Sequence, residues 1–281
     1  MKRSPAGERV KCWKVASLPK LELLRATYIT QSFSRHSHEG FAVGVIEEGA
    51  LGFYYRGENV VAARGSINLA NPDEPHTGHA MTDQGWTYRM FYLHPDVLTD
   101  AVWEMSGKSG EMPFFQSGVL LDDQLAWTIH DLHVAMEDGR MESMELKTRF
   151  YLMLSRLIRK HADAPPGSYR VGKERHAVKR ALEFIEEHYH EDVSIESLAS
   201  AAHLSAFHLI RVFSGETGLT PHAHLNQVRV RKAKELLAKG RSLSAVAAET
   251  GFADQSHFTR RFKRLTGMTP GQYSNFVQYN A

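Results

Sequence analysis

The stretch RVFSGETGLTP, residues 211–221, returns 49 residues later in the chain as RRFKRLTGMTP, residues 260–270. Upstream of each copy, small and apolar residues also match at an offset of 48 or 49. These residues are Ile195, Leu198, Ala199 and Leu204 in the first copy and Leu243, Val246, Ala247 and Phe252 in the second. Agreement at this many positions indicates two copies of one structural unit.

Each copy has the pattern of two helices joined by a tight turn. Residues with side chains that cap helix N-termini stand before each predicted helix, namely Ser194, Ser205, Ser242 and Asp254. The turns fall at His203-Leu204 and at Gly251, and the second helices end at Gly218 and Gly267. This is the spacing of a helix-turn-helix, so the tail from residue 173 is predicted to be all helical.

The charge of the tail fits a polyanionic partner. Residues 201–281 carry 11 Lys and Arg against 4 Asp and Glu, a net charge of +7, whereas the whole chain has a net charge of +2. One long helix from Pro221 to about Lys239 is predicted between the units. About 18 residues at 1.5 Å each span roughly 27 Å, which would hold two recognition helices near one turn of double-stranded DNA, about 34 Å apart.

The outward residues of the second helix in each unit are the predicted DNA contacts. A recognition helix presents its N-terminal residues to base edges, which Arg, Gln and apolar groups can read. The predicted set is Phe207, His208, Ile210 and Arg211 in the first unit and Gln255, Ser256, His257, Thr259 and Arg260 in the second. Residues predicted to neutralise phosphates are Lys263, Arg264, Arg229, Arg231 and Lys232.

In the front of the chain the apolar residues have a different spacing. Residues 1 to about 105 have short apolar runs broken by turn residues, with a hairpin turn expected at residues 56–59, which predicts a β-barrel or sandwich. Residues 122–162 predict a helical hairpin. The stretch DAPPGS, residues 163–168, predicts a linker. We therefore expect a two-domain α+β protein, with a front domain at 1–162, a linker at 163–172 and an all-α domain at 173–281.

Composition excludes several classes of protein. Of the 281 residues, 42% are hydrophobic and 23% are charged, which excludes disorder over most of the length. No apolar run approaches the roughly 18 residues of a membrane-spanning helix, and the basic N-terminus precedes no apolar signal segment. The one cysteine, Cys12, allows neither an internal disulfide nor a cysteine-rich zinc site. We expect a cytoplasmic protein without a membrane partner.

Residues 176–279, above all GFADQSHFTRRFKRLTGMTPGQYSNF, resemble the AraC/XylS family of bacterial transcription regulators. The resemblance implies seven helices with two helix-turn-helix units. It places base-facing positions on Phe207, Ile210, Arg211, Gln255, Ser256 and Arg260. Several family members have polar residues where this chain has Phe207 and Ile210. Those two positions therefore fit thymine methyl or backbone contacts better than hydrogen bonding to bases.

Residues 33–93, notably RHSHEGFAVGVIEEG and GSINLANPDEPH, resemble the cupin-like sensor barrel of the same family. The resemblance implies a small-molecule effector inside the barrel. Candidate effector-binding residues are His36, His38, Phe41, His76, Trp86, Tyr88, Arg89 and Tyr92. Strand alternation turns Arg89 away from Trp86, Tyr88 and Tyr92 unless a bulge intervenes. A packed aromatic core is the alternative to a pocket.

Three of these candidates, His36, His38 and His76, also have the side chains of metal ligands. Ala42 and Val43 occupy the positions at which catalytic cupins have a metal-binding Glu, and sensor cupins of the family generally lack a metal. We therefore expect no metal, no cofactor and no catalytic residue. A metal-bound histidine cluster and a metal-dependent cupin enzyme fused to a DNA-binding module remain alternatives.

Taken together, the sequence predicts a ligand-responsive, DNA-binding transcription regulator that is not an enzyme. The resemblance implies an activator that contacts RNA polymerase, with repression as an alternative, and a homodimer. The helical hairpin would supply the dimer contact through exposed parts of the stripe Leu125, Ile129, Leu132 and Met136, or would belong to the core. An architectural DNA binder without an effector is a further alternative.

Overall fold

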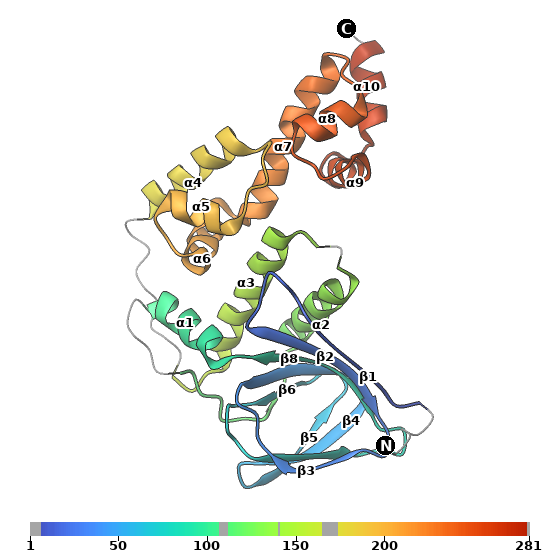
Figure 1. The fold of residues 1–281 in the computed structure, drawn as a ribbon, viewed down its shortest axis with the longest axis vertical. Coiled ribbons are helices and arrows are strands. Elements are labelled where there is room, and N and C mark those ends of the chain that lie inside the picture. The colour runs from blue at the N-terminus through green and yellow to red at the C-terminus, as the bar shows by residue number, and fades with distance from the viewer. Residues whose placement is uncertain (1–6, 107–111, 140, 165–173, 280–281) are drawn as a thin grey trace. The chain divides into compact units, whose positions relative to one another are not determined.

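The computed structural model describes residues 7–106, 112–139, 141–164 and 174–279. The chain forms two compact units, Met1–Tyr169 and Arg170–Ala281, one built on antiparallel strands and the other on helices (Figure 1). The predicted α+β class is therefore confirmed. The predicted linker at 163–172 lies outside the described residues except for its first two positions.

The front unit begins with two antiparallel sheets that share one long strand. The larger has the strand order β1-β2-β8-β4-β6-β9, and the smaller pairs β3 with β7, β7 with β4 and β4 with β5. The strands are β1 (Arg9–Lys14), β2 (Leu21–Tyr28), β3 (Ser32–His36), β4 (Phe41–Tyr55), β5 (Glu58–Ala63), β6 (Ile67–Ala70), β7 (His76–Ala80), β8 (Trp86–Leu93) and β9 (Val119–Leu120).

A bend in β4 lets this strand belong to both sheets. The register with β8 shifts between Ile46 and Glu48, and Gly49 follows with φ +69°. A Cβ at Gly49 would lie 2.0 Å from the carbonyl oxygen of Gly85, so no side chain fits there. Beyond the bend, β4 turns into β5 through Arg56 and Gly57, both at positive φ, as in a two-residue hairpin turn. This is the hairpin turn that the sequence predicts.

The described residues of the front unit also form three helices, namely α1 (Pro95–Ser106), which precedes β9, and α2 (Asp123–Asp138) and α3 (Ser143–His161), which follow it. The predicted helical hairpin is confirmed. Asp122 caps α2 by accepting from the Leu125 backbone N–H, and Gly139 ends α2 at φ +62°. Helix α1 was not predicted, although it buries Leu98, Ala101, Val102 and Met105 at helical spacing behind Pro95.

The described residues of the second unit, 174–279, form the seven helices that the family resemblance implies. They are α4 (Arg175–His188), α5 (Ile195–Ala202), α6 (Ala206–Thr217), α7 (Pro221–Ala238), α8 (Leu243–Glu249), α9 (Gln255–Thr266) and α10 (Pro270–Tyr279). Helix α7 contacts α4 and α6, which precede it in the chain, and α8, α9 and α10, which follow it. Across the described residues, no helix is long and apolar enough to cross a lipid bilayer.

The predicted caps of both helix-turn-helix units are present. The side chains of Ser194, Ser205, Ser242 and Asp254 each accept a backbone N–H at the start of their helices. Gly218 and Gly267 end the recognition helices α6 and α9 in the left-handed conformation. The first turn contains His203 at φ +55° and the second contains Gly251 at φ +75°. The two units are thus built by the same local interactions.

Candidate functional site

Helix α9 presents the most open polar surface of the two recognition helices. Phe258 and Phe262 are fully buried, and they fix which face of α9 is turned outward. His257 is half-buried and accepts a hydrogen bond from Arg261 Nε to its Nε2 at 3.2 Å. The exposed residues on the outer face include four of the predicted DNA contacts, Gln255, Ser256, Arg260 and Lys263.

Helix α6 has a different surface from α9. Phe207 and Ile210, which the sequence places on the outward face, are only 4% and 0% exposed. Burial of large apolar side chains away from water is favourable, so these two side chains pack into the core. The positions of outward residues on a predicted helix do not show which neighbours cover them. His208 lies 2.7 Å from Glu174, measured from Nε2 to Oε1, and Arg211 is half-buried. The outer face of α9 is thus formed by exposed polar residues, whereas Phe207 and Ile210 of α6 are buried, and their predicted place on the outward face was wrong.

Arg229 is not available to a DNA phosphate. Its Nε and Nη2 donate to the backbone carbonyls of Tyr189 and Glu191 at 2.8 Å each, and its side chain is 4% exposed. The prediction that Arg229 neutralises a phosphate is wrong, because this guanidinium is used to hold the chain before α5 against α7. Arg231 is exposed and hydrogen-bonds Glu186.

A cavity of about 140 Å³ lies inside the barrel between the two sheets. Its wall is aromatic and aliphatic, with imidazole, hydroxyl and amide groups between. The lining residues are Leu24, Tyr28, Phe33, His36, His38, Ala42, Leu51, Phe53, Asn68, Leu69, Ala70, His76, Thr77, Gly78, Trp86, Tyr88, Met90 and Tyr92. No Asp, Glu, Lys or Arg is among these lining residues.

Six of the eight residues predicted to contact an effector line this cavity, and Phe41 and Arg89 do not. Alternation along the strands is the reason. Phe41 is fully buried and its ring packs edge-on against Phe115, while its neighbour Ala42 faces the cavity. The prediction that Phe41 and Arg89 share a pocket with the other six residues was therefore wrong.

Arg89 instead connects the larger sheet to helix α2. Its Nε donates to Glu47 at 2.8 Å and its Nη1 donates to Glu137 at 2.6 Å. Nη1 also lies 3.1 Å from Nδ1 of His133, a fully buried residue of α2. Burial alone would raise the pKa of Glu137, but hydrogen bonds from Lys11 and Arg89 outweigh it and lower the pKa to about 2. This ion-pair network holds the helical hairpin against the barrel.

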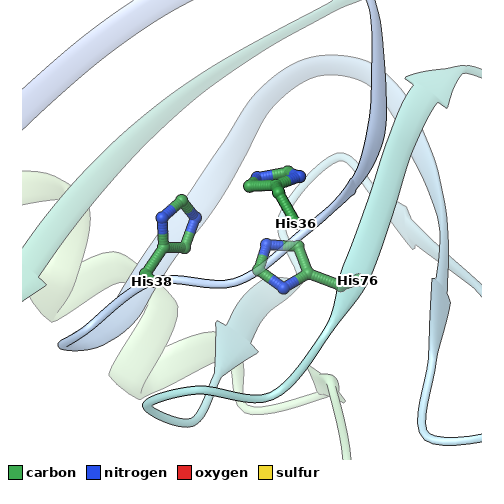
Figure 2. A group of neighbouring side chains, drawn as sticks. All are labelled: His36, His38 and His76. Atoms are coloured by element: carbon green, nitrogen blue, oxygen red, sulfur yellow. The ribbon is translucent and has the colours of Figure 1, made fainter.

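Three histidines of the cavity lining lie close together (Figure 2). His36 ends β3, His76 begins β7, and the two are register partners between these strands, while His38 follows β3 in a loop. Their ring centroids are 4.5 to 5.0 Å apart. Burial, together with the neighbouring His76 and His36, lowers the pKa of His38 to about 4, and burial also lowers the pKa of His76.

Most of the remaining lining residues were not predicted from the sequence. Tyr28 and Phe33 lie opposite Trp86 at ring-centroid distances of 5.2 and 6.3 Å. Burial raises the pKa of Tyr28, and it raises the pKa of Tyr92 to about 12, so both phenols keep the proton that makes them hydrogen-bond donors. The alternation of Leu24, Ala26 and Tyr28 along β2 was the available signal.

Two family models match the chain. Residues 18–154 match the AraC-like ligand binding domain, and residues 198–275 match a helix-turn-helix domain. An uncharacterized HTH-type transcriptional regulator of Bacillus subtilis, YbfI, is 33% identical over 84% of this chain and 85% of its own. The HTH-type transcriptional activator RhaS of Klebsiella pneumoniae is 25% identical over 85% of this chain and 86% of its own.

A solved structure of the DNA-binding domain of AdpA, a global transcriptional factor, in complex with a target DNA is 28% identical to this chain. The match covers 37% of this chain and 95% of that structure, with a TM-score of 0.36.

Proposed function

The chain belongs to the AraC family of helix-turn-helix transcription regulators, and from that premise we propose how its two units divide the work. The helical unit binds a specific DNA site, with α9 as the main reader of bases. The barrel binds a small effector in its cavity and thereby changes DNA binding or transcription. The observation that carries the proposal is the outer face of α9, where exposed polar and basic residues stand on a helix fixed by buried Phe258 and Phe262.

The contacts of α9 divide into two kinds in this proposal. Gln255 and Arg260 suit bidentate hydrogen bonds to adenine and guanine edges in the major groove. Lys263 and Arg264, in the last turn of α9, suit phosphates. On α6, Arg211 and His208 are the polar candidates, whereas Phe207 and Ile210 are buried and make no base contact in this proposal.

The test is DNA binding by the full chain. A binding site is first selected from random duplexes, and affinity is then measured by fluorescence anisotropy at several salt concentrations. Arg260→Ala is expected to lose about 1–3 kcal/mol on the selected site, a factor of roughly 5–150, and little on random DNA. Arg64→Ala is the matched control, because Arg64 is an exposed arginine of the barrel unit.

Equal losses on selected and random DNA would instead assign Arg260 to a phosphate. Selection that yields no preferred site at all would refute sequence-specific regulation.

The cavity supports a small effector. Its volume of about 140 Å³ is close to that of an engineered protein cavity, about 150 Å³, that binds benzene, so the effector would be about the size of one six-membered ring. The aromatic wall of Trp86, Tyr88 and Tyr28 suits the flat face of such a ring. Replacing Met90 in the cavity wall by Trp should fill the space and abolish any metabolite response while leaving DNA binding intact. A response that survives M90W would place the effector elsewhere.

We propose a homodimer that uses a different surface from the one the sequence predicts. Leu125, Ile129, Leu132 and Met136 are all at most 5% exposed, so this stripe belongs to the core of the front unit. On the outward side of α2, Trp127 is 64% exposed, and a large exposed aromatic side chain is a common interface residue. Sedimentation of the Trp127→Ser variant should show a shift toward monomer if α2 forms the contact. An unchanged dimer would place the interface elsewhere.

We further propose that the output is transcription activation through contact with RNA polymerase, in the cytoplasm where the genome lies, without catalysis. The name of the relative RhaS, a transcriptional activator, supports this direction. A reporter gene placed behind the selected site should be expressed more strongly when the chain is present. Lower expression would identify a repressor.

A further inference from the structure

We propose that His36, His38 and His76 bind one divalent transition-metal ion, and that an open coordination position of this ion receives an anionic effector. The first half of the proposal concerns the barrel alone. The second half rests on the proposed function of the cavity as the effector site. The sequence favoured histidines without a metal, and the arrangement of the three rings in the structure is the reason to revise that expectation.

The three side chains already converge on one point. One ring nitrogen from each of His36, His38 and His76 lies within 4.8 Å of the others, and the rings face the same space (Figure 2). Three imidazole nitrogens on one zinc ion, each about 2.0–2.1 Å from it, lie about 3.3 Å apart in a tetrahedral site. The three rings are half-buried and border a cavity, so small ring rotations can bring these nitrogens to the distances that one ion requires.

Backbone contacts orient two of the three rings as a metal site requires. Nδ1 of His36 lies 2.8 Å from the carbonyl oxygen of Ser34, and Nδ1 of His76 lies 2.9 Å from that of Glu74. A carbonyl oxygen only accepts, so Nδ1 carries the proton in both rings and Nε2 keeps its lone pair. Metal-binding histidines are commonly held by such a hydrogen bond from the other ring nitrogen. Both contacts are also local, to a residue two positions earlier in the chain.

The ligand set indicates the kind of ion. Imidazole suits zinc, copper, nickel and iron, and the described cavity wall offers no thiolate or carboxylate that would favour another class. Three protein ligands leave the fourth position of a tetrahedral zinc site open, as in catalytic zinc sites. Here that position would face the cavity space that His38 and Tyr92 border, with ring centroids 5.2 Å apart.

Charge balance indicates the kind of effector. Three neutral imidazoles leave a bound ion with its full charge of +2, and the lining residues contain no Asp or Glu to neutralise it. An isolated charge in a largely apolar cavity is costly, so an anionic ligand would be favoured over a neutral one. The effector class is therefore a small molecule of about one ring with a carboxylate, hydroxamate or similar anionic donor.

The experiment uses the full chain without an affinity tag, because a polyhistidine tag would bind the same ions. The protein is freed of metal with a chelator and titrated with Zn²⁺ by calorimetry and with Co²⁺ by visible absorption. We expect one ion per chain, and a thermal melting temperature several degrees higher with Zn²⁺ than with chelator. The variant His38→Gln should weaken binding at least 100-fold and lose the shift in melting temperature.

His79→Gln is the matched control, because His79 is an exposed histidine on the same strand as His76 and lies outside the cluster. This variant should bind like the wild type. No stoichiometric binding, or equal weakening in both variants, would overturn the metal site. If His38→Gln does not fold, His36→Gln and His76→Gln are measured instead under the same criteria.

Acetohydroxamate, a small chelating anion, then tests the open position. Added to the Co²⁺-loaded protein, it should change the visible spectrum, and an unchanged spectrum would overturn the effector half of the proposal. DNA binding is measured separately. A chain that binds DNA but no metal would overturn the metal site alone. A chain that binds the ion but selects no DNA would overturn the proposed regulatory function and support the metal site.

Discussion

Replacing Arg89 by Met should destabilise the barrel unit strongly, because it breaks a largely buried ion-pair network. Arg89 is 3% exposed, and the side chains of its partners Glu47 and Glu137 are 14% and 16% exposed. Removing one partner of a buried ion pair costs about 3–5 kcal/mol, since the remaining charge stays poorly solvated. At roughly 2–4 °C per kcal/mol for a unit of this size, the melting temperature should fall by about 6–20 °C.

A nearby arginine provides the control for this experiment. Arg25 also pairs with Glu47, at 3.2 Å, but its side chain is 46% exposed. Surface ion pairs contribute about 0–1 kcal/mol, so Arg25→Met should change the melting temperature by no more than a few degrees. Thermal unfolding of wild type and both variants, followed by circular dichroism at pH 7, measures the difference.

The pH dependence gives a second readout of the same network. The pKa of Glu137 is about 2 in the folded chain against an ordinary value of 4.5, so ionised Glu137 stabilises the fold above pH 4.5, and this contribution is lost as the pH falls toward 2. Without Arg89 the carboxyl would take up its proton at higher pH. The gap between wild type and Arg89→Met should therefore shrink below pH 4.5. A melting temperature within 3 °C of wild type, or a gap that does not change with pH, would refute this account of Arg89.

Two further predictions concern helix ends and turns. Asp122→Ala should lower the free energy of unfolding by about 1–3 kcal/mol, because the carboxylate caps α2 at the Leu125 N–H and accepts a hydrogen bond from Lys160. Asp122→Asn should retain the cap and lose less. Denaturant unfolding measures both variants, and equal losses would contradict this account. Gly251→Ala should destabilise the second helix-turn-helix more than Gly267→Ala does, although both residues have positive φ. A Cβ at Gly251 would meet a backbone carbonyl oxygen at 2.7 Å, and one at Gly267 would meet open space; equal melting temperatures would show that φ alone decides.

Local signals in the sequence predicted the caps, turns and stops of both helix-turn-helix units and the long helix between them, but not the separate bounds of α4 and α10. The duplicated pattern contains its own caps and stops, so the boundaries of the long helix at Pro221–Ala238 follow from residues within a few positions of them. The same holds for Asp122 and Gly139 at the ends of α2. In such interactions the two partners are only a few residues apart, so both can be identified from the sequence.

Residues whose partners lie far along the chain were the ones misplaced. Arg229 looks like any basic residue of an exposed helix until its carbonyl acceptors, 38 and 40 residues earlier, are known. Arg89 pairs with carboxylates 42 and 48 residues away, on a strand and on a helix. Phe207 and Ile210 were placed outward from the predicted recognition helix and the family resemblance, but their burial depends on packing partners that neither specifies.

The alternation along β8 has a practical consequence for engineering the proposed effector response. Trp86, Tyr88, Met90 and Tyr92 border the cavity, while Arg89 between them holds α2. A mutant library restricted to the even-numbered positions would vary the lining of the proposed effector cavity and spare the docking of the helical hairpin. Randomising the whole strand would also replace Arg89 and so produce many unstable clones. In a screen, an unfolded clone would then look the same as one that no longer binds its ligand.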